Sequence, residues 1–210
     1  MKVLITAGPT YERIDPVRFI GNYSTGKMGF ALAENCADRG FDVILIAGPV
    51  KLQTSHSNIK RIDVESAAEM YDAVMQCFES CEVAIFCAAV ADFTPEKRHD
   101  QKIKRKTDDL VIKLKPTKDI AAAAGSIKRE HQLVVGFALE TNDEQVNALN
   151  KMQRKNLDMI VLNSLNDNGA GFGYDTNKVT IITKNGEKLE LPLLPKDEVA
   201  SRIIDNIVAL

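Results

Sequence analysis

The sequence has little of three things on which many functions depend: charge of one sign, long apolar runs and histidine. Its 27 Lys and Arg residues nearly balance 29 Asp and Glu residues, which leaves a net charge of −2 over 210 residues. This balance gives no overall field to hold nucleic acid or an anionic membrane, so any anion must bind locally. The longest apolar stretches, Val43–Val50 and Val83–Ala91, are far shorter than the roughly 20 residues of a membrane-crossing helix. We therefore expect neither a membrane span nor a nucleic-acid partner.

Histidine and cysteine are too few and too scattered to indicate triad hydrolysis or a zinc site. The histidines are His56, His99 and His131, and no Asp or Cys is spaced with them as in a recognisable triad. The cysteines form no Cys-x-x-Cys pair and no zinc-type spacing with histidine; they are Cys36, Cys77, Cys81 and Cys87. Their apolar surroundings predict buried, reduced thiols. Because the chain also begins without a charged and apolar leader, we expect a cytoplasmic protein.

Six short β-rich runs alternate with amphipathic patterns, in a chain whose 45% hydrophobic content is ample for a core. The runs are Val3–Thr6, Val43–Ala47, Ile59–Val64, Val83–Cys87, Leu133–Ala138 and Met159–Asn163. Continuous apolar runs of this length are typical of strands buried on both faces, as in a parallel sheet. Between them, helical spacing recurs in two sets, Met28, Leu32 and Cys36, then Ala67, Tyr71, Val74 and Phe78.

This alternation predicts a doubly wound, Rossmann-like α/β domain covering residues 1–210. Two more helices are expected. One opens with a capping box at Thr141–Glu144 and runs to about Lys155, and the other closes the chain from Pro195. Sheets of this kind hold their ligands beyond the carboxyl ends of the strands. The loops to search are therefore those after Thr6, Cys87 and Ala138.

A hairpin near the end of the chain does not follow the βα alternation. Val179–Thr183 and Lys188–Leu191 flank Asn185-Gly186, a pair that favours a type I′ turn because both of its central positions need positive φ. We expect this hairpin to form part of a small appendage that spans about 94–115 and 174–192. The appendage is a candidate contact with a second copy of the chain.

Residues Gly21–Met28 match G-x-x-x-x-G-K, but Met28 stands where a P-loop needs a hydroxyl for Mg²⁺. The segment is therefore not a P-loop. A turn of Ser24, Thr25 and Gly26 that opens a helix still offers hydroxyls, free N–H groups and a positive dipole end to a phosphate. An ordinary capped helix start explains the same residues.

Two further patterns bear on nucleotide binding. Tyr23-x-x-x-Lys27 mimics the pair of short-chain dehydrogenases, but no Gly-x-Gly-x-x-Gly follows the first strand, which counts against a nicotinamide cofactor. Cys87–Phe93 ends a strand with small residues and places Asp92 just beyond it. A base or ribose could approach the backbone there. Tight sheet packing followed by a solvated Asp is the alternative interpretation.

Basic residues crowd into one ten-residue stretch, Lys97, Arg98, Lys102, Lys104, Arg105 and Lys106. Since few local carboxylates accompany them, repulsion predicts a loop that is mobile until an anion binds. A solvated loop, a nucleic-acid patch and a phosphate-closing flap are the three interpretations, and the lack of interleaved aromatic residues counts against single-stranded nucleic acid. Lys151 and Lys155 share one predicted helix face, either as exposed surface or as a second anion contact.

An ordered series of segments along nearly the whole chain resembles bacterial phosphopantothenoylcysteine synthetase. The segments are Ile5–Thr10, Ile14–Arg18, Asn22–Gly29, Ala88–Asp92, Lys102–Lys104, Gly136-Phe137, Glu140–Asn142 and Arg154–Asp158. The family joins 4′-phosphopantothenate to L-cysteine in coenzyme A biosynthesis, and its bacterial members use CTP with Mg²⁺. In many bacteria the synthetase is fused behind a flavin-dependent decarboxylase, so the resemblance implies a stand-alone synthetase or an excised domain.

The resemblance also implies residue roles. Asn22 matches the family's catalytic asparagine. The residues implied to hold the nucleotide are Phe86, Cys87, Ala88, Asp92, Lys102, Thr117, Lys118, Asp119, Ile120, Phe137, Lys151 and Lys155. The sequence departs from the usual pattern at Gly21 and Thr25, where serines are usual, at Arg105, where lysine is common, and at Thr117-Lys118, where Asn-Pro is usual.

The implied reaction agrees with the signals for phosphate binding. The carboxylate of 4′-phosphopantothenate would attack the α-phosphate of CTP and expel pyrophosphate, and the cysteine amine would then displace CMP from the acyl-cytidylate. Lys102 is suited to offset the charge of the first step, and the neutral Asn22 to orient the acyl group or donate to its oxyanion in the second. The alternatives are a nicotinamide-dependent reductase and a nucleotide-sensing or nucleic-acid-binding module built on the basic loop.

Overall fold

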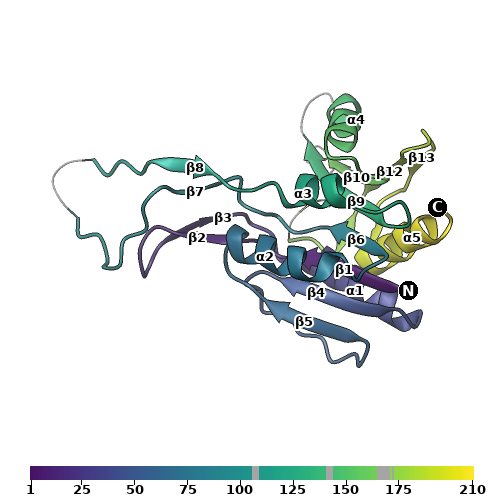
Figure 1. Ribbon diagram of the computed structural model, residues 1–210, viewed down its shortest axis with the longest axis horizontal. Coiled ribbons are helices and arrows are strands. Elements are labelled where there is room, and N and C mark those ends of the chain that lie inside the picture. Colours follow the sequence, from purple (N-terminus) through teal and green to yellow (C-terminus); the bar gives the residue numbers. More distant parts are fainter. Residues whose placement is uncertain (106–108, 141–143, 165–170, 172) are drawn as a thin grey trace.

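A single eight-stranded sheet forms the body of the molecule in this computed structural model, which describes residues 1–105, 109–140, 144–164, 171 and 173–210 (Figure 1). Its strands are β1 (Lys2–Ala7), β4 (Asp42–Ala47), β5 (Ile59–Asp63), β6 (Val83–Phe86), β9 (Leu133–Glu140), β10 (Met159–Ser164), β12 (Val179–Thr183) and β13 (Lys188–Glu190). From β5 through β4, β1, β6 and β9 to β10 every neighbouring pair runs parallel. With the chain order reversing at β1, this is the doubly wound topology that the sequence predicts.

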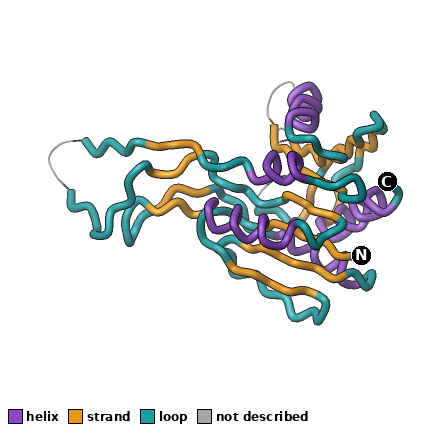
Figure 2. Tube along the Cα trace, in the orientation of Figure 1, coloured by secondary structure: helices purple, strands orange, loops and turns teal. Residues whose placement is uncertain are grey.

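Helices cover both faces of the sheet, as Figure 2 shows. They are α1 (Lys27–Asp38), α2 (Ala67–Phe78), α3 (Ile120–Ile127), α4 (Glu144–Arg154) and α5 (Lys196–Val208). Successive residues of a strand point to opposite faces, so β1 places Val3 and Ile5 in the core shared with α1 and α5, and Leu4 in the core shared with α2, α3 and α4. Burial on both faces explains why the predicted strands read as continuous apolar runs.

The predicted closing helix is confirmed as α5, with Pro195 as its N-cap and with Val199, Ile203 and Ile207 buried. The helix predicted to run to about Lys155 is confirmed as α4, which ends at Arg154. The capping box expected before it includes residues 141–143, which lie outside the described part of the chain.

The late hairpin differs from its prediction in place and in turn type. β12 pairs antiparallel with β10 and β13 pairs with β12, so both strands extend the main sheet instead of leaving it. Only Gly186 of the turn has positive φ, at 87°, and its N–H donates to the Thr183 carbonyl at 3.0 Å. The loop is therefore a three-residue turn that ends in a left-handed glycine, a common alternative to type I′. The apolar side chains of β12 decide its place, because Ile181 is buried in the core.

Two antiparallel hairpins project together from the body as a long arm (Figure 1). One pairs β2 (Tyr11–Arg13) with β3 (Phe19–Gly21), and the other pairs β7 (Phe93–Pro95) with β8 (Leu114–Pro116). We call residues 11–21, 93–105 and 109–116 the arm. The remaining short strands, β11 (Thr176–Asn177) and β14 (Leu194–Pro195), pair with each other beside α5.

None of the described helices combines the length and apolarity that crossing a bilayer requires. The described cysteines are all free thiols, with Cys36 and Cys81 buried and Cys77 and Cys87 partly exposed.

Candidate active site

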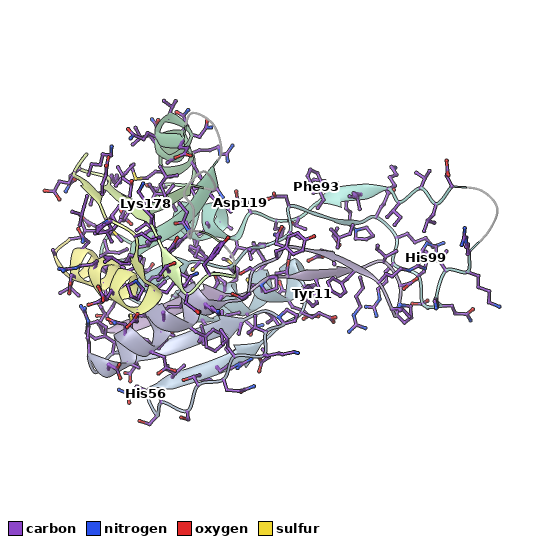
Figure 3. The ribbon with its side chains drawn as sticks, turned by 180° about the vertical axis from the view of Figure 1, so that it is seen from behind. Tyr11, His56, Phe93, His99, Asp119 and Lys178 are labelled. Carbon is purple, nitrogen blue, oxygen red and sulfur yellow. The ribbon has the colours of Figure 1, made fainter. Side chains whose placement is uncertain are left out.

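A cleft of about 660 Å³ lies over the carboxyl ends of the parallel strands, where the fold predicts a ligand site. Its floor includes Thr6 at the end of β1, Phe86 at the end of β6 and Ala138 near the end of β9. The arm leaves the body at this cleft, since Asn22 follows β3 and Asp92 precedes β7. In Figure 3, Tyr11, Phe93 and His99 mark the course of the arm, and Asp119 marks the adjoining edge of the body.

Every predicted site residue except Lys102 lines this cleft. The lining includes Asn22, Ser24, Thr25, Gly26, Phe86, Cys87, Ala88, Asp92, Thr117, Lys118, Asp119, Ile120, Phe137, Lys151 and Lys155. They come from five separate parts of the chain, and the fold alone brings them together. Their roles stay predictions, because shared placement fixes a site and not its chemistry.

The N-terminus of α1 forms one wall of the cleft. Gly26 precedes the helix with φ of 81°, and it has no side chain to cap the first turn. The backbone N–H groups at Lys27, Met28 and Gly29 are therefore left for another acceptor, and all three residues line the cleft. Ser24 Oγ accepts from the Gly26 N–H at 3.3 Å, which holds the turn in shape. This geometry suits a phosphate group.

Asn22 stands at the base of the arm, tied to the loop after β6. Its amide Nδ2 donates to the carbonyl oxygens of Ala89 at 3.0 Å and Val90 at 3.2 Å. Since these carbonyls only accept, the NH₂ end of the amide is the end that faces them. The Asn22 carbonyl oxygen is thus the atom that the side chain presents as an acceptor.

The opposite wall is built by α3 and the end of α4. Asp119 caps α3 by accepting from the Ala122 N–H at 3.1 Å, and it pairs with the Lys155 ammonium at 2.9 and 3.0 Å. Lys118 turns its ammonium over the Tyr71 ring, 4.2 Å from the ring centre. Thr117 is fixed by a bond from its hydroxyl to the Ala91 carbonyl at 2.7 Å. This wall therefore presents the ion pair of Asp119 and Lys155 to the cleft.

The floor is tightly packed. Thr6 Oγ1 accepts from the Ala88 N–H at 3.2 Å, joining the ends of β1 and β6. On β9 a Cβ at Gly136 would stand 2.6 Å from Leu157 Cδ1, so a larger residue there would require the Leu157 side chain to shift. Beside them, burial raises the pKa of the Cys87 thiol to about 12. The Cys36 thiol in the core behind α1 also has its pKa raised to about 12 by burial.

Cys36 and Cys87 should resist alkylation in the native protein. With each pKa raised by about three units, the thiolate fraction at pH 8 falls by roughly a thousandfold, and only the thiolate attacks an alkylating reagent. Iodoacetamide should modify the partly exposed Cys77 first, and all four cysteines should react in denaturant. Peptide mass spectrometry measures the order, and early modification of Cys87 would contradict the prediction.

The cleft also contains polar side chains that were not predicted as site residues, among them Lys27, Asn163, Asn177 and Lys196. Lys196 is buried, and its ammonium donates to the carbonyls of Gly171 at 3.2 Å, Thr176 at 3.3 Å and Tyr174. Burial lowers its pKa from the ordinary value. It thereby ties Gly171, Tyr174 and Thr176 to the start of α5.

Asn163 also went unpredicted, although it ends the run Met159–Asn163 at the carboxyl edge of the sheet. That position was a usable signal. Its Nδ2 donates to Asn177 Oδ1 at 3.4 Å. Among the described side chains, Asn163 Oδ1 is the buried polar atom without a hydrogen bond.

Lys102 lies on the arm and is not part of the lining of its own chain's cleft. The residue after it, Ile103, is held by the β2–β3 hairpin, where Asp15 Oδ2 accepts from the Ile103 N–H at 3.0 Å. A carboxylate that is distant in the sequence therefore holds the basic loop at this point. Sequence analysis missed the contact because Asp15 and Ile103 are 88 residues apart.

No group of three or more His, Cys, Asp or Glu side chains in the described ranges is arranged to hold a metal ion by itself. The acidic side chains at the cleft are Asp92 and Asp119.

Comparison with a family model matches residues 1–210 to the DNA/pantothenate metabolism flavoprotein C-terminal domain. Among curated relatives, a cysteine/cysteine sulfinic acid decarboxylase from an unknown prokaryotic organism is 56% identical over 209 residues, covering 100% of this chain and 58% of the relative. The coenzyme A biosynthesis bifunctional protein CoaBC of Bacillus subtilis (strain 168) is 50% identical over 208 residues, covering 99% of this chain and 51% of the relative. The chain thus spans slightly more than half the length of these relatives.

Solved structures show the same fold. The crystal structure of the C-terminal domain of CoaBC has a TM-score of 0.83 and 42% identity, covering 98% of this chain and 93% of that one. A Cab2 mutant in complex with phosphopantothenate-cysteine has a TM-score of 0.76 at 17% identity, covering 99% of this chain and 85% of that one. From its cleft, its topology and a match over its whole length, the chain belongs to the family of the DNA/pantothenate metabolism flavoprotein C-terminal domain.

Proposed function

We propose that this chain is a phosphopantothenate–cysteine ligase that uses CTP with Mg²⁺ in coenzyme A biosynthesis. The observation that carries the proposal is the cleft that gathers all of the residues implied by the family resemblance except Lys102. The names of its relatives support the pathway, since the Bacillus subtilis protein acts in coenzyme A biosynthesis and the Cab2 structure holds phosphopantothenate-cysteine. The free cysteines agree with a cytoplasmic location.

The two walls of the cleft suit the two ends of a nucleotide. The N-terminus of α1 would take phosphates, because its N–H groups and positive dipole end attract anions. The wall of Asp119 and Lys155, with Phe137 and the backbone near Ala88 on the floor, would hold the base and ribose. Asp92 also lines the cleft, and its carboxylate would suit Mg²⁺, which is commonly held by one or two carboxylates and by substrate phosphates. When bound, Mg²⁺ would neutralise charge on the triphosphate.

The chemistry then follows from charge and orientation. In the first step a carboxylate oxygen of 4′-phosphopantothenate bonds to the α-phosphorus of CTP while the bond to pyrophosphate breaks. In the second the cysteine nitrogen bonds to the acyl carbon, CMP leaves, and the nitrogen loses a proton. Asn22 was expected to orient the acyl group or to donate to its oxyanion, but its Nδ2 bonds to two backbone carbonyls, which leaves its oxygen for a third role. Its Oδ1 would accept from the cysteine amine and aim the nitrogen at the acyl carbon.

Product analysis tests the proposed activity directly. We expect the protein with 4′-phosphopantothenate, L-cysteine, Mg²⁺ and CTP to give a product whose mass is that of the two acids joined with loss of water. In parallel, CTP should raise the melting temperature, and at a concentration of 100 times its Kd by the equivalent of about 2.7 kcal/mol, whereas NADPH should not. ATP in place of CTP measures base selectivity. No amide product with any nucleotide, together with stabilisation by NADPH, would support a nicotinamide-dependent reductase instead.

We also propose that the chain works as a homodimer whose arm completes the partner's cleft. Large apolar side chains on the arm are unusually exposed, including Val17, Phe93 and Val111, of which Val111 is 87% exposed. Lys102 lies on the same arm and outside its own cleft. A second copy would cover the apolar residues and receive Lys102. The flavin-dependent decarboxylase of related pathways would then act on the product, either from the same longer chain or as a separate protein.

Mixing two inactive variants tests this arrangement. If Lys102 acts on the partner's cleft, Lys102→Gln and Asn22→Asp subunits that exchange should regain about a quarter of wild-type activity, because half of the dimers are mixed and each has one intact site. Light scattering checks that the mixture is dimeric. A dimer without any recovery would place Lys102 and Asn22 of the same chain in one site.

A further inference from the structure

We propose that Asp15 is a positioning residue, which fixes Lys102 for the nucleotide step by holding the backbone of the neighbouring Ile103. The inference rests on the proposed function for the role of Lys102. Asp15 lies in the turn between β2 and β3, on the side of the arm opposite to the hairpin that carries Lys102. Asp15 does not line the cleft, and the basic character of the loop does not predict its contact with Ile103.

The carboxylate of Asp15 has no exposed surface, and both of its oxygens accept hydrogen bonds. Oδ1 accepts from the backbone N–H groups of Val17 and Arg18, both at 2.9 Å. Oδ2 accepts from Arg18 Nε at 3.0 Å, from Arg18 Nη2 and from the Ile103 N–H at 3.0 Å. The two oxygens therefore have different partners. Oδ1 bonds only within the β2–β3 turn, whereas Oδ2 also bonds to the other hairpin at Ile103.

Ile103 is held at both of its backbone groups. Its N–H donates to Asp15, and its carbonyl accepts from Arg18 Nη2 at 2.9 Å. Nearby, the His99 N–H donates to the Ile14 carbonyl at 2.9 Å. This arrangement fixes the peptide between Lys102 and Lys104, so the position of the Lys102 Cα is set by the β2–β3 turn and not by the basic loop itself.

A buried anion is a strong anchor because it is costly to leave unpaired. The Arg18 guanidinium and the three backbone N–H groups hold the pKa of the Asp15 carboxyl well below its usual range. Asp15 is therefore charged throughout the neutral range. A lysine that must meet a crowded triphosphate benefits from such an anchor, because a fixed backbone leaves the lysine less freedom to lose in the transition state.

Asp15→Asn distinguishes the roles of the two carboxylate oxygens. Asparagine keeps one acceptor oxygen for the Val17 and Arg18 N–H groups, and places an NH₂ group against the donors that Oδ2 served. Backbone exchange at Ile103 should then become at least tenfold faster by hydrogen exchange and mass spectrometry. Pyrophosphate release in a single turnover should fall about tenfold or more. In a Lys102→Gln background the same change should cause no further loss, because the two residues act through one contact.

Two other variants keep the test decisive. Glu65→Gln breaks the exposed pair with Arg13 at 2.7 Å on the same hairpin and should change neither exchange at Ile103 nor pyrophosphate release. Ile103→Pro removes the N–H that Asp15 accepts, fixes φ at that position and restricts the backbone of Lys102. It should lower pyrophosphate release as Asp15→Asn does, and it takes the place of that variant if Asp15→Asn does not fold. Unchanged exchange at Ile103 in Asp15→Asn would overturn the anchor. Faster exchange with normal pyrophosphate release would overturn the positioning role. Normal release in Lys102→Gln alone would instead refute the proposed role of Lys102, while exchange at Ile103 would still report on the anchor.

Discussion

Lys102→Gln should reduce pyrophosphate release by roughly a hundredfold to a thousandfold, the usual loss when one donor to a developing charge is removed. The first step brings a carboxylate against a triphosphate, and the ammonium of Lys102 is the cation assigned to offset that charge. The loss should appear in the absence of cysteine, because the step precedes the amine. Pyrophosphate released in one turnover, measured with 4′-phosphopantothenate and CTP alone, gives the value.

Lys104→Gln is the matched control for this variant. Lys104 flanks the same anchored residue, Ile103, and carries the same charge in the same exposed loop. If general attraction of the basic loop for nucleotide were responsible, both substitutions would weaken release alike, and more salt would reduce the difference from wild type. A defect confined to Lys102→Gln, present at saturating CTP, identifies a contact made in the reaction itself.

Asn22→Asp should stop amide formation while leaving pyrophosphate release largely intact. The substitution keeps the shape of the side chain. It places a carboxylate oxygen opposite the Ala89 and Val90 carbonyls, in the position that the Nδ2 donor of Asn22 occupies in the wild type. Loss of both hydrogen bonds frees the side chain, and its negative charge opposes the charge that develops at the acyl carbon. We expect amide formation to fall by about a hundredfold or more, with acyl-cytidylate accumulating.

The measurement is the ratio of pyrophosphate to amide after cysteine is added, with acyl-cytidylate detected by mass. Asn185→Asp, in the exposed turn before β13, makes the same chemical change far from the cleft and should leave both steps unchanged. If Asn22→Asp loses pyrophosphate release as completely as Lys102→Gln, then both residues serve activation or nucleotide binding, and the division of roles is wrong.

The order of strands and helices was determined by the sequence itself, since burial on both faces makes each parallel strand a continuous apolar run. From that order and the handedness of βαβ units, the carboxyl edge of the sheet follows as the ligand site. The loops after Thr6 and Cys87 were expected there for this reason, and Ser24 and Asp92 from these loops do line the cleft. The resemblance to a family supplied the more individual residues.

Only the tertiary structure decided what depends on contacts between distant parts of the chain. The late hairpin reads as an appendage in sequence, yet Ile181 buries against the core and draws β12 into the main sheet. In the sequence, Lys196 is an ordinary lysine at the start of a helix. In the structure, its ammonium donates to backbone carbonyls that are 20 and 25 residues away along the chain. Likewise, a basic loop rich in like charges gives no hint of Asp15, because no local pattern encodes a hydrogen bond that spans 88 residues.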